Sequence, residues 1–349
     1  MCWLCAREIL LDTCECAGLS YPRSAVMLSE SKPILIIGAG VSGLTLAQAC
    51  RKNSIPYRIF ERDESATYRS AGWGLTIHWA LPTFKSLLPE DLVARFPETY
   101  VNREAVEAGE KGSFTFFELS TGEARWQVPA AERIRVYREK LRKLLLTGIN
   151  VEWAKTLEEV KLVDEGVEAM FADGTTVLGS MVVGCDGAKS LVRKILHPGD
   201  SQTALLPVRF IGAGVVYDKE IVNPILKLDP YFLQGSDPRT DVFLWFSFLE
   251  TPADGMPQGQ YRCQIMISWP YRERFLGRVE PTEMPNTKTG QLSFMRHVSE
   301  RWAEPFRSIV HNIPRDAEVR PIELGDYCPR TCNGFGGRVA LVGDAAHAM

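Results

Sequence analysis

Residues 33–43 read Pro-Ile-Leu-Ile-Ile-Gly-Ala-Gly-Val-Ser-Gly, and this stretch decides the fold. Its apolar first half has the length and composition of a buried strand. Each of the three glycines that follow meets a separate structural requirement. Gly38 permits a tight turn, Gly40 lets the backbone approach a bound phosphate group, and Gly43 lets a helix pack closely on the strand. The sequence therefore predicts a strand, a phosphate-binding loop and a helix in direct succession.

The next residues complete a βαβ unit of the dinucleotide-binding type. A helix is expected from about Ser42 to Lys52, and a second strand from Tyr57 to Glu61. Free N–H groups and the dipole at the helix start favour a pyrophosphate. Glu61 stands 23 residues after Gly38, where a carboxylate accepts hydrogen bonds from ribose hydroxyls and disfavours a 2′-phosphate. FAD or NAD is thus favoured over NADP at this site.

The overall composition indicates a sizeable core and small-molecule partners. Of the 349 residues 45% are hydrophobic, and 40 basic and 43 acidic side chains leave a net charge of −3. This balance argues against nucleic acid as a partner. Because no run of 18 apolar residues occurs, no membrane-spanning helix is expected. Nine cysteines, an odd number in a long chain, favour a reducing compartment, so the cytoplasm is the expected location.

Residues 1–30 are interpreted as an unstructured leader, and Met27 as a possible start of the functional protein. This segment contains four cysteines: Cys2, Cys5, Cys14 and Cys16. Four thiolates are enough to bind zinc, but a C-x-C pair lacks the usual spacing of a zinc knuckle. The histidines also lack metal-ligand spacing, and no metal site is predicted.

Two kinds of segment alternate along the rest of the chain. Residues 31–110, 130–200 and 325–349 are assigned to a discontinuous dinucleotide-binding domain, and residues 111–129 and 201–324 to a substrate-binding region. The predicted fold class is α/β, a Rossmann-like domain with an inserted antiparallel-sheet substrate domain.

The secondary structure of these segments follows from periodicity. In residues 261–269 apolar positions alternate with Arg262, Gln264 and Ser268, which is typical of a half-buried antiparallel strand. One helix is expected to begin near Val136, and another to run from about Gln291 to Val310.

Two features of the second region admit more than one interpretation. Gly212-Ala213-Gly214 looks like a second dinucleotide loop, but Tyr217 replaces its third glycine, and sheet is predicted instead. A group of aromatic residues either lines a substrate cavity or belongs to the core. These residues are Phe243, Trp245, Phe246 and Phe248.

Two later segments identify the dinucleotide. Residues 184–193 read Gly-Cys-Asp-Gly-Ala-Lys-Ser-Leu-Val-Arg, and residues 337–347 read Gly-Arg-Val-Ala-Leu-Val-Gly-Asp-Ala-Ala-His. With the glycine loop, they match the three fingerprints of FAD-dependent monooxygenases of the para-hydroxybenzoate hydroxylase (aromatic-ring hydroxylase) type. These are GxGxxG, D-G-x-x-S-x-x-R and G-D-A-A-H. The chain resembles this family from about residue 33 to residue 349.

The resemblance implies FAD contacts in both later motifs. Asp344, followed by Ala345, is expected to reach the ribityl hydroxyls of the flavin half. Asp186 is expected near the pyrophosphate and in the path of the nicotinamide, with Arg193 holding that segment. His347 is expected to pack in the flavin-side turn.

Further FAD contacts are implied earlier in the chain. Arg138 resembles the helix-opening arginine that reaches the FAD phosphates, with a solvated helix arginine as the alternative. Arg62 resembles the residue that flanks the adenine. Gly72 and Gly74 fall where the family passes its backbone close to the flavin, and a plain loop is the alternative there.

The family activity implies a monooxygenase that inserts one atom of O2 into an aromatic or alkene-containing small molecule, such as a polyketide or terpenoid. NAD(P)H is expected as a transient co-substrate. Because the flavin supplies the chemistry, no catalytic side chain is predicted. A non-oxygenating FAD-dependent oxidoreductase is one alternative. The family continues beyond the G-D motif into a helix at the flavin, so the end at Met349 also implies a truncated chain, with an incompetent fragment as the other alternative.

Overall fold

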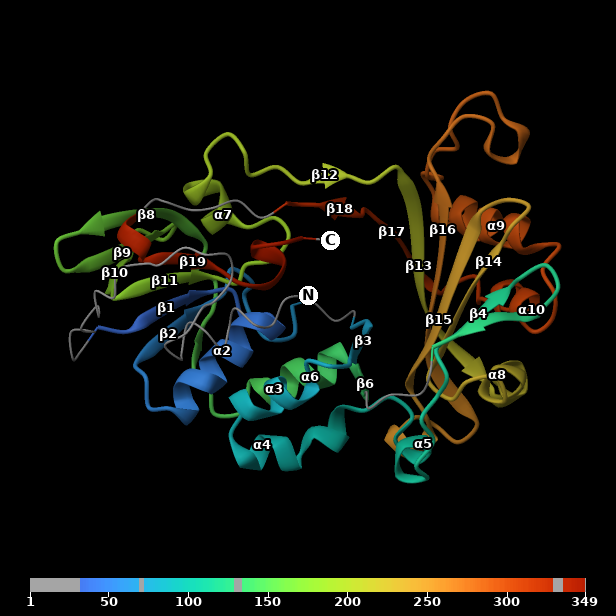
Figure 1. Cartoon of the computed structure of the whole chain (residues 1–349), viewed down its shortest axis with the longest axis horizontal. Helices are drawn as coiled ribbons and strands as arrows, with labels where there is room; N and C mark the ends of the chain where they lie inside the picture. The colour runs from blue at the N-terminus through green and yellow to red at the C-terminus, as the bar shows by residue number, and fades with distance from the viewer. Residues whose placement is uncertain (1–31, 69–71, 129–133, 329–334, 349) are drawn as a thin grey trace.

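The structure is a computed structural model that describes residues 32–68, 72–128, 134–328 and 335–348. The predicted leader, its four cysteines and Met27 lie outside these residues. Figure 1 shows two parts side by side, a parallel-sheet part and a large-sheet part, each named for its main sheet.

Five parallel strands, counted over the described residues, form the sheet of the parallel-sheet part in the order β19, β11, β1, β2, β7. They are Val339–Leu341, Met181–Gly184, Ile34–Ile37, Tyr57–Phe60 and Val151–Glu152. The central strand β1 is buried at every position, which explains its unbroken apolar sequence. The predicted strand, helix and strand of the βαβ unit are confirmed.

Alternate residues of β1 pack on different layers. Ile34 and Ile36 contact helices α2 (Val41–Lys52) and α6 (Arg138–Leu145). Leu35 and Ile37 face a three-stranded sheet on the other side. Its strands are β8 (Leu157–Val163), β9 (Gly166–Phe171) and β10 (Thr176–Gly179). Two layers therefore sandwich β1 and leave the carboxyl ends of the strands free to form a site.

The large-sheet part holds a sheet with strand order β17, β13, β16, β15, β14, β4, β5. In that order the strands are Glu318–Ile322, Val208–Asp218, Gln260–Pro270, Val242–Glu250, Phe232–Asp237, Thr115–Glu118 and Ala124–Gln127. Neighbours are antiparallel as predicted, except that β14 and β4 run parallel. The segment Gly212–Gly214 lies within β13, which confirms the interpretation as sheet.

The two faces of the large sheet have different neighbours. One face packs on helices α8 (Lys219–Leu226), α9 (Lys288–Ser299) and α10 (Phe306–His311), which lie on the outer side in Figure 1. Phe246 and Phe248 are buried in this core. The alternating neighbours Phe243 and Trp245 are only half-buried and lie on the opposite face, here called the free face. The aromatic group is thus divided between core and free face.

A two-stranded ribbon lies between the two parts. Strands β3 (Gly74–Ile77) and β6 (Ile134–Tyr137) pair antiparallel, and both contact β15. Helix α6 begins at Arg138, two residues after the expected start near Val136, because Val136 pairs with Leu75 in the ribbon. Arg138 therefore opens the helix, as the resemblance implies. β-branched residues favour the strand at this position.

The helix predicted from Gln291 to Val310 is in fact two helices. α9 ends at Ser299 and α10 begins at Phe306. Pro305 precedes α10, and its ring and missing N–H are incompatible with the interior of a continuous helix.

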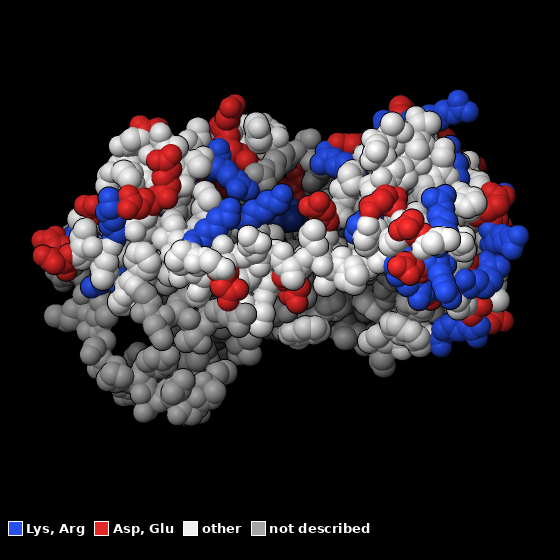
Figure 2. Space-filling view, turned by 90° about the horizontal axis from the view of Figure 1, so that it is seen from above, with Lys and Arg blue, Asp and Glu red and all other residues white. Residues whose placement is uncertain are grey.

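The remaining elements are short. They are α3 (Leu81–Leu87), α4 (Glu90–Ala94), α5 (Arg103–Glu107), α7 (Leu191–Leu196), β12 (Ala204–Leu205), β18 (Gly325–Asp326), η1 (Phe96–Thr99), η2 (Pro252–Asp254), η3 (Phe275–Gly277), η4 (Phe335–Gly337) and η5 (Gly343–Ala345). Within the four described ranges, every helix is too short or too polar to traverse a bilayer. Figure 2 shows acidic and basic side chains intermingled over the upper face, with basic ones beside the hollow between the two parts.

Candidate FAD site

A cavity of about 500 Å³ opens at the carboxyl ends of the parallel strands. Its wall includes most of the residues predicted to bind FAD: Gly38, Gly40, Glu61, Arg62, Gly74, Arg138, Asp186 and Asp344. The other two predicted residues, Gly43 and Ala345, do not line it. Segments separated by about 300 positions in the sequence thus meet around one space.

Two glycines of the loop are required by contacts within the protein. Gly38 has a φ of +105°, and an added Cβ would lie 2.5 Å from the Cys185 carbonyl oxygen. A Cβ on Gly43 would overlap the Gly38 carbonyl oxygen. Gly38 therefore forms the turn, and Gly43 lets α2 approach it.

Gly40 has no such requirement. Its φ of −78° suits any residue, and nothing lies within 4 Å of the place where a Cβ would stand. This open space belongs to the cavity, at the start of α2, where no side chain caps the helix and no acidic residue occupies the first turn. Any side chain at position 40 would fill this space. The space lies beside the free N–H groups at the start of α2, and such a place fits a pyrophosphate.

Glu61 follows β2 and is held by backbone groups. Its Oε2 accepts a hydrogen bond from Ala39 N at 2.7 Å, and its Oε1 accepts one from Asp63 N at 3.1 Å. The residue is 9% exposed and lines the cavity. The carboxylate is fixed in orientation and keeps further lone pairs for ribose hydroxyls.

Gly74 lines the cavity where β3 begins, and a contact within the protein requires glycine there. A Cβ there would overlap the guanidinium group of Arg135. Arg135 is buried and donates from Nε to Ser247 Oγ (2.6 Å) and from Nη1 to Thr76 Oγ1 (2.7 Å), while burial lowers its pKa to about 9. The Gly74 amide donates to Gln264 Oε1 at 2.9 Å. The cavity wall at Gly74 is therefore fastened to the free face of the large sheet.

Asp186 has a structural partner at each oxygen. Its Oδ1 accepts from the Ser190 hydroxyl, and its Oδ2 accepts from the Leu191 and Val192 amides at 2.6 and 3.3 Å. The carboxylate thus caps the start of α7 while the residue lines the cavity. Both carboxylate oxygens are therefore already engaged within the protein.

Arg193 ties the two later motifs together. It is 2% exposed, and its Nη1 donates to the Ala345 and Asp344 carbonyl oxygens at 3.0 and 3.2 Å. Its guanidinium carbon lies 4.3 Å from the centre of the Tyr327 ring. The backbone of Asp344 is thereby held at the cavity wall, which Asp344 lines, while Ala345 is buried behind it. His347 lines the cavity in the same turn.

Comparison with known proteins identifies the family. The family described as "FAD binding domain" matches residues 31–349. A protein of Arthroderma benhamiae named "Probable FAD-dependent monooxygenase" is 44% identical over 339 residues, which cover 93% of this chain and 78% of that protein. The chain belongs to the FAD-dependent monooxygenases.

Other relatives place this FAD-dependent monooxygenase in the same group. The FAD-dependent monooxygenase tazP of Aspergillus terreus is 36% identical over 334 residues, which cover 90% of this chain and 83% of that protein. The solved structure of 2,6-dihydroxypyridine-3-hydroxylase from Arthrobacter nicotinovorans shares the fold, with a TM-score of 0.64, 22% identity and coverage of 90% of this chain and 77% of that chain.

The monooxygenase site also contains residues that the sequence did not indicate. Lys155, Thr156 and Leu157 line the cavity because β7 pairs with β2 and the Lys155 amide donates to the Glu61 carbonyl oxygen at 2.8 Å. No sequence motif marks these three residues, because only the pairing of β7 with β2 brings them to the cavity. Trp73 also lines the cavity, and its carbonyl oxygen accepts from the Arg138 amide at 3.0 Å.

The cavity wall also contains a buried thiol. Cys185 lines the cavity, but burial raises the pKa of its thiol well above the ordinary value, so it stays protonated. Among the residues that the structure describes, no three His, Cys, Asp or Glu side chains are grouped to hold a metal ion.

Proposed function

We propose that this monooxygenase uses NAD(P)H and dioxygen to hydroxylate an aromatic small molecule held between the FAD cavity and the free face of the large sheet. One observation carries the proposal: the cavity wall is fastened directly onto that face. Trp73 covers Gly212 of β13, and Gly74 donates to Gln264 of β16. A ligand at this end of the cavity would therefore stand beside the free face.

The fit of FAD assigns a role to each predicted residue. Glu61 and Arg62 would hold the adenosine half, the loop at Gly40 and Arg138 the pyrophosphate, and Asp344 the ribityl chain. Gly38, Gly43, Asp186 and Ala345 would shape the wall behind these contacts. Bound FAD supplies electron transfer and dioxygen activation, chemistry that amino-acid side chains lack.

The free face supports an aromatic substrate. Strand register places Phe210 and Phe243 opposite Ser268, and Trp245 opposite Met266, so these side chains share the face. All of them are half-buried. Flat rings and a thioether on the free face favour a planar aromatic ligand, since stacked aromatic pairs contribute about 0.5–1.5 kcal/mol beyond area burial. The same walls would exclude water from the reacting atoms.

Two observations support a transient nicotinamide partner. The second glycine trio, Gly212–Gly214, is a strand and not a dinucleotide loop. Basic side chains, with acidic ones among them, border the hollow between the two parts (Figure 2), and the basic ones would attract an anionic co-substrate.

Isotope labelling tests the proposal. The protein loaded with FAD would be supplied with NADH or NADPH, ¹⁸O₂ and a panel of phenols, aromatic polyketides and terpenoid alkenes. Incorporation of one ¹⁸O atom into an aromatic product is expected. Oxidation of the nicotinamide or substrate without ¹⁸O in any product would show a non-oxygenating oxidoreductase, and labelling of alkenes alone would contradict the aromatic class.

A further inference from the structure

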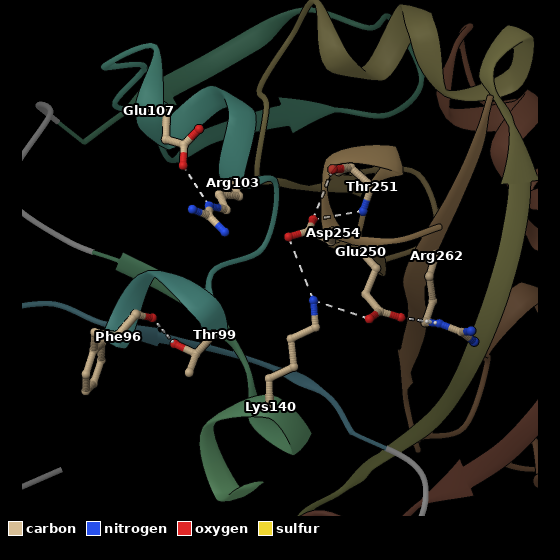
Figure 3. Close-up of polar contacts among 9 residues, drawn as sticks. All are labelled: Phe96, Thr99, Arg103, Glu107, Lys140, Glu250, Thr251, Asp254 and Arg262. Atoms are coloured by element: carbon tan, nitrogen blue, oxygen red, sulfur yellow. Dashed lines mark hydrogen bonds and ion pairs between the residues drawn. The ribbon is translucent and has the colours of Figure 1, made fainter. Parts of the chain in front are cut away.

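An ion cluster joins the two parts of the molecule beside the helix that carries Arg138. Lys140, in the first turn of α6, extends toward two carboxylates of the large-sheet part (Figure 3). Its Nζ lies 3.3 Å from Glu250 Oε1 and 3.7 Å from Asp254 Oδ1. Glu250 ends β15, and Asp254 ends the short helix η2.

Both carboxylates are oriented by their own part of the molecule. Arg262 Nε donates to Glu250 Oε2 at 2.8 Å. The amide and hydroxyl of Thr251 each donate to Asp254 Oδ2 at 3.0 Å. The side chains of Asp254, Glu250 and Lys140 are only 4%, 19% and 23% exposed. Salt therefore screens this cluster less than a surface pair, and the two acids form a ready-made receptor for the ammonium group.

The neighbouring cation does not substitute for Lys140. Figure 3 shows Arg103 close by, but its Nε is paired with Glu107 Oε1 on the same helix at 2.6 Å. The contact from α6 to the acidic pair is thus made by Lys140.

Helix α6 depends on such contacts. It has eight residues, and Tyr137 at its N-cap position provides no side-chain cap. A helix this short is stabilised by tertiary packing and not by its own propensity. Successive helical residues turn by about 100°, so Arg138 and Lys140 point to nearly opposite sides. Arg138 lines the cavity, and one turn on, Arg142 Nε donates to the Ala39 carbonyl oxygen of the glycine loop at 3.0 Å.

We infer that Lys140 is a positioning residue for FAD binding. By fixing the first turn of α6 to the large-sheet part, it sets where Arg138 and the glycine loop stand relative to the free face. FAD affinity and the docking of the two parts are then coupled, although Lys140 does not line the cavity. The inference rests on the role proposed above for Arg138 and the loop.

The test compares FAD affinity in matched variants of the full chain. Lys140→Met removes the charge, Lys140→Arg keeps it, and Lys143→Met removes an exposed charge on the same helix. FAD dissociation constants would be measured by flavin fluorescence at low and high salt, with thermal unfolding of each apo protein. Lys140→Met should bind FAD about 5- to 10-fold more weakly, in the usual range of coupling between sites. Lys140→Arg and Lys143→Met should stay within about 2-fold of the unmodified chain.

Each outcome decides the inference. A loss in Lys140→Met that Lys140→Arg restores, with less salt dependence than the unmodified chain and with the apo protein still fully folded at the titration temperature, supports it. Equal affinities of Lys140→Met and Lys143→Met overturn it, as does a loss that accompanies a lowered unfolding temperature and is not restored by arginine. Failure of the unmodified chain to bind FAD would instead refute the FAD site itself.

Discussion

Replacement of Gly40 by valine should separate cofactor binding from folding. The backbone at Gly40 accepts an L side chain, and the space beside it is open, so the stability of the apo protein should change by no more than about 0.5 kcal/mol. That open space is where the pyrophosphate is expected. Three added carbon atoms would push it away from the N–H groups of α2, and a loss of at least 100-fold in FAD affinity, about 2.7 kcal/mol, is expected.

Two other glycines provide the controls. Gly214→Val also meets open space, in β13 opposite Gln264, but Gly214 does not line the cavity, so both FAD affinity and stability should be nearly unchanged. Gly43→Ala forces a methyl group against the Gly38 carbonyl oxygen and should destabilise the apo protein by about 1–3 kcal/mol or more. FAD titration by fluorescence quenching and urea unfolding of the apo proteins measure both quantities. Normal FAD affinity in Gly40→Val would refute the assignment of the loop.

Four further outcomes follow from the same geometry. Glu61→Ala should weaken FAD binding by about 1.5–3 kcal/mol, the contribution of hydrogen bonds to a charged group; calorimetric titration measures this, and unchanged affinity would exclude Glu61 from the site. Asp344→Ala should cost about 1–3 kcal/mol of FAD binding and keep its circular dichroism spectrum; normal binding with a lost spectrum would make the residue structural. Phe246→Ala, in the core of the large sheet, should lower the free energy of unfolding by about 3–5 kcal/mol in urea; a loss below 1 kcal/mol would contradict its packing. Iodoacetamide at pH 8 should modify the exposed Cys328 well before the buried Cys185, as seen by peptide mass mapping; equal rates would show that the cavity wall opens.

The sequence predicts the parts of the site that depend on local conformation. Gly38 is needed by a turn with positive φ, and Gly43 by a close approach to Gly38, so both signals lie within a few residues. The further contact of Gly38 with Cys185 is distant in sequence. The roles of the two later motifs come from their resemblance to a family, because the family pattern says which part of FAD each motif contacts.

What the sequence leaves open depends on distant pairings. The place of Lys155 at the cavity follows from the β2–β7 register. The need for glycine at 74 follows from Arg135, a residue of the paired strand. The run Ile134–Tyr137 is too short for periodicity to distinguish strand from helix, so periodicity alone gives the start of α6 only to within two residues.

The place of β19 in the parallel sheet also constrains how the protein is made. β19 pairs with β11, yet roughly 155 residues separate Gly184 from Val339. At 5–20 residues per second, a ribosome needs about 8 to 30 s to add that length. During this interval one edge of β11 has no partner from its own chain, and an unpaired edge strand is a template for pairing with another chain. The hairpins of the large sheet have time to form during this interval. The parallel-sheet part, whose first strands are synthesised earliest, is therefore completed last.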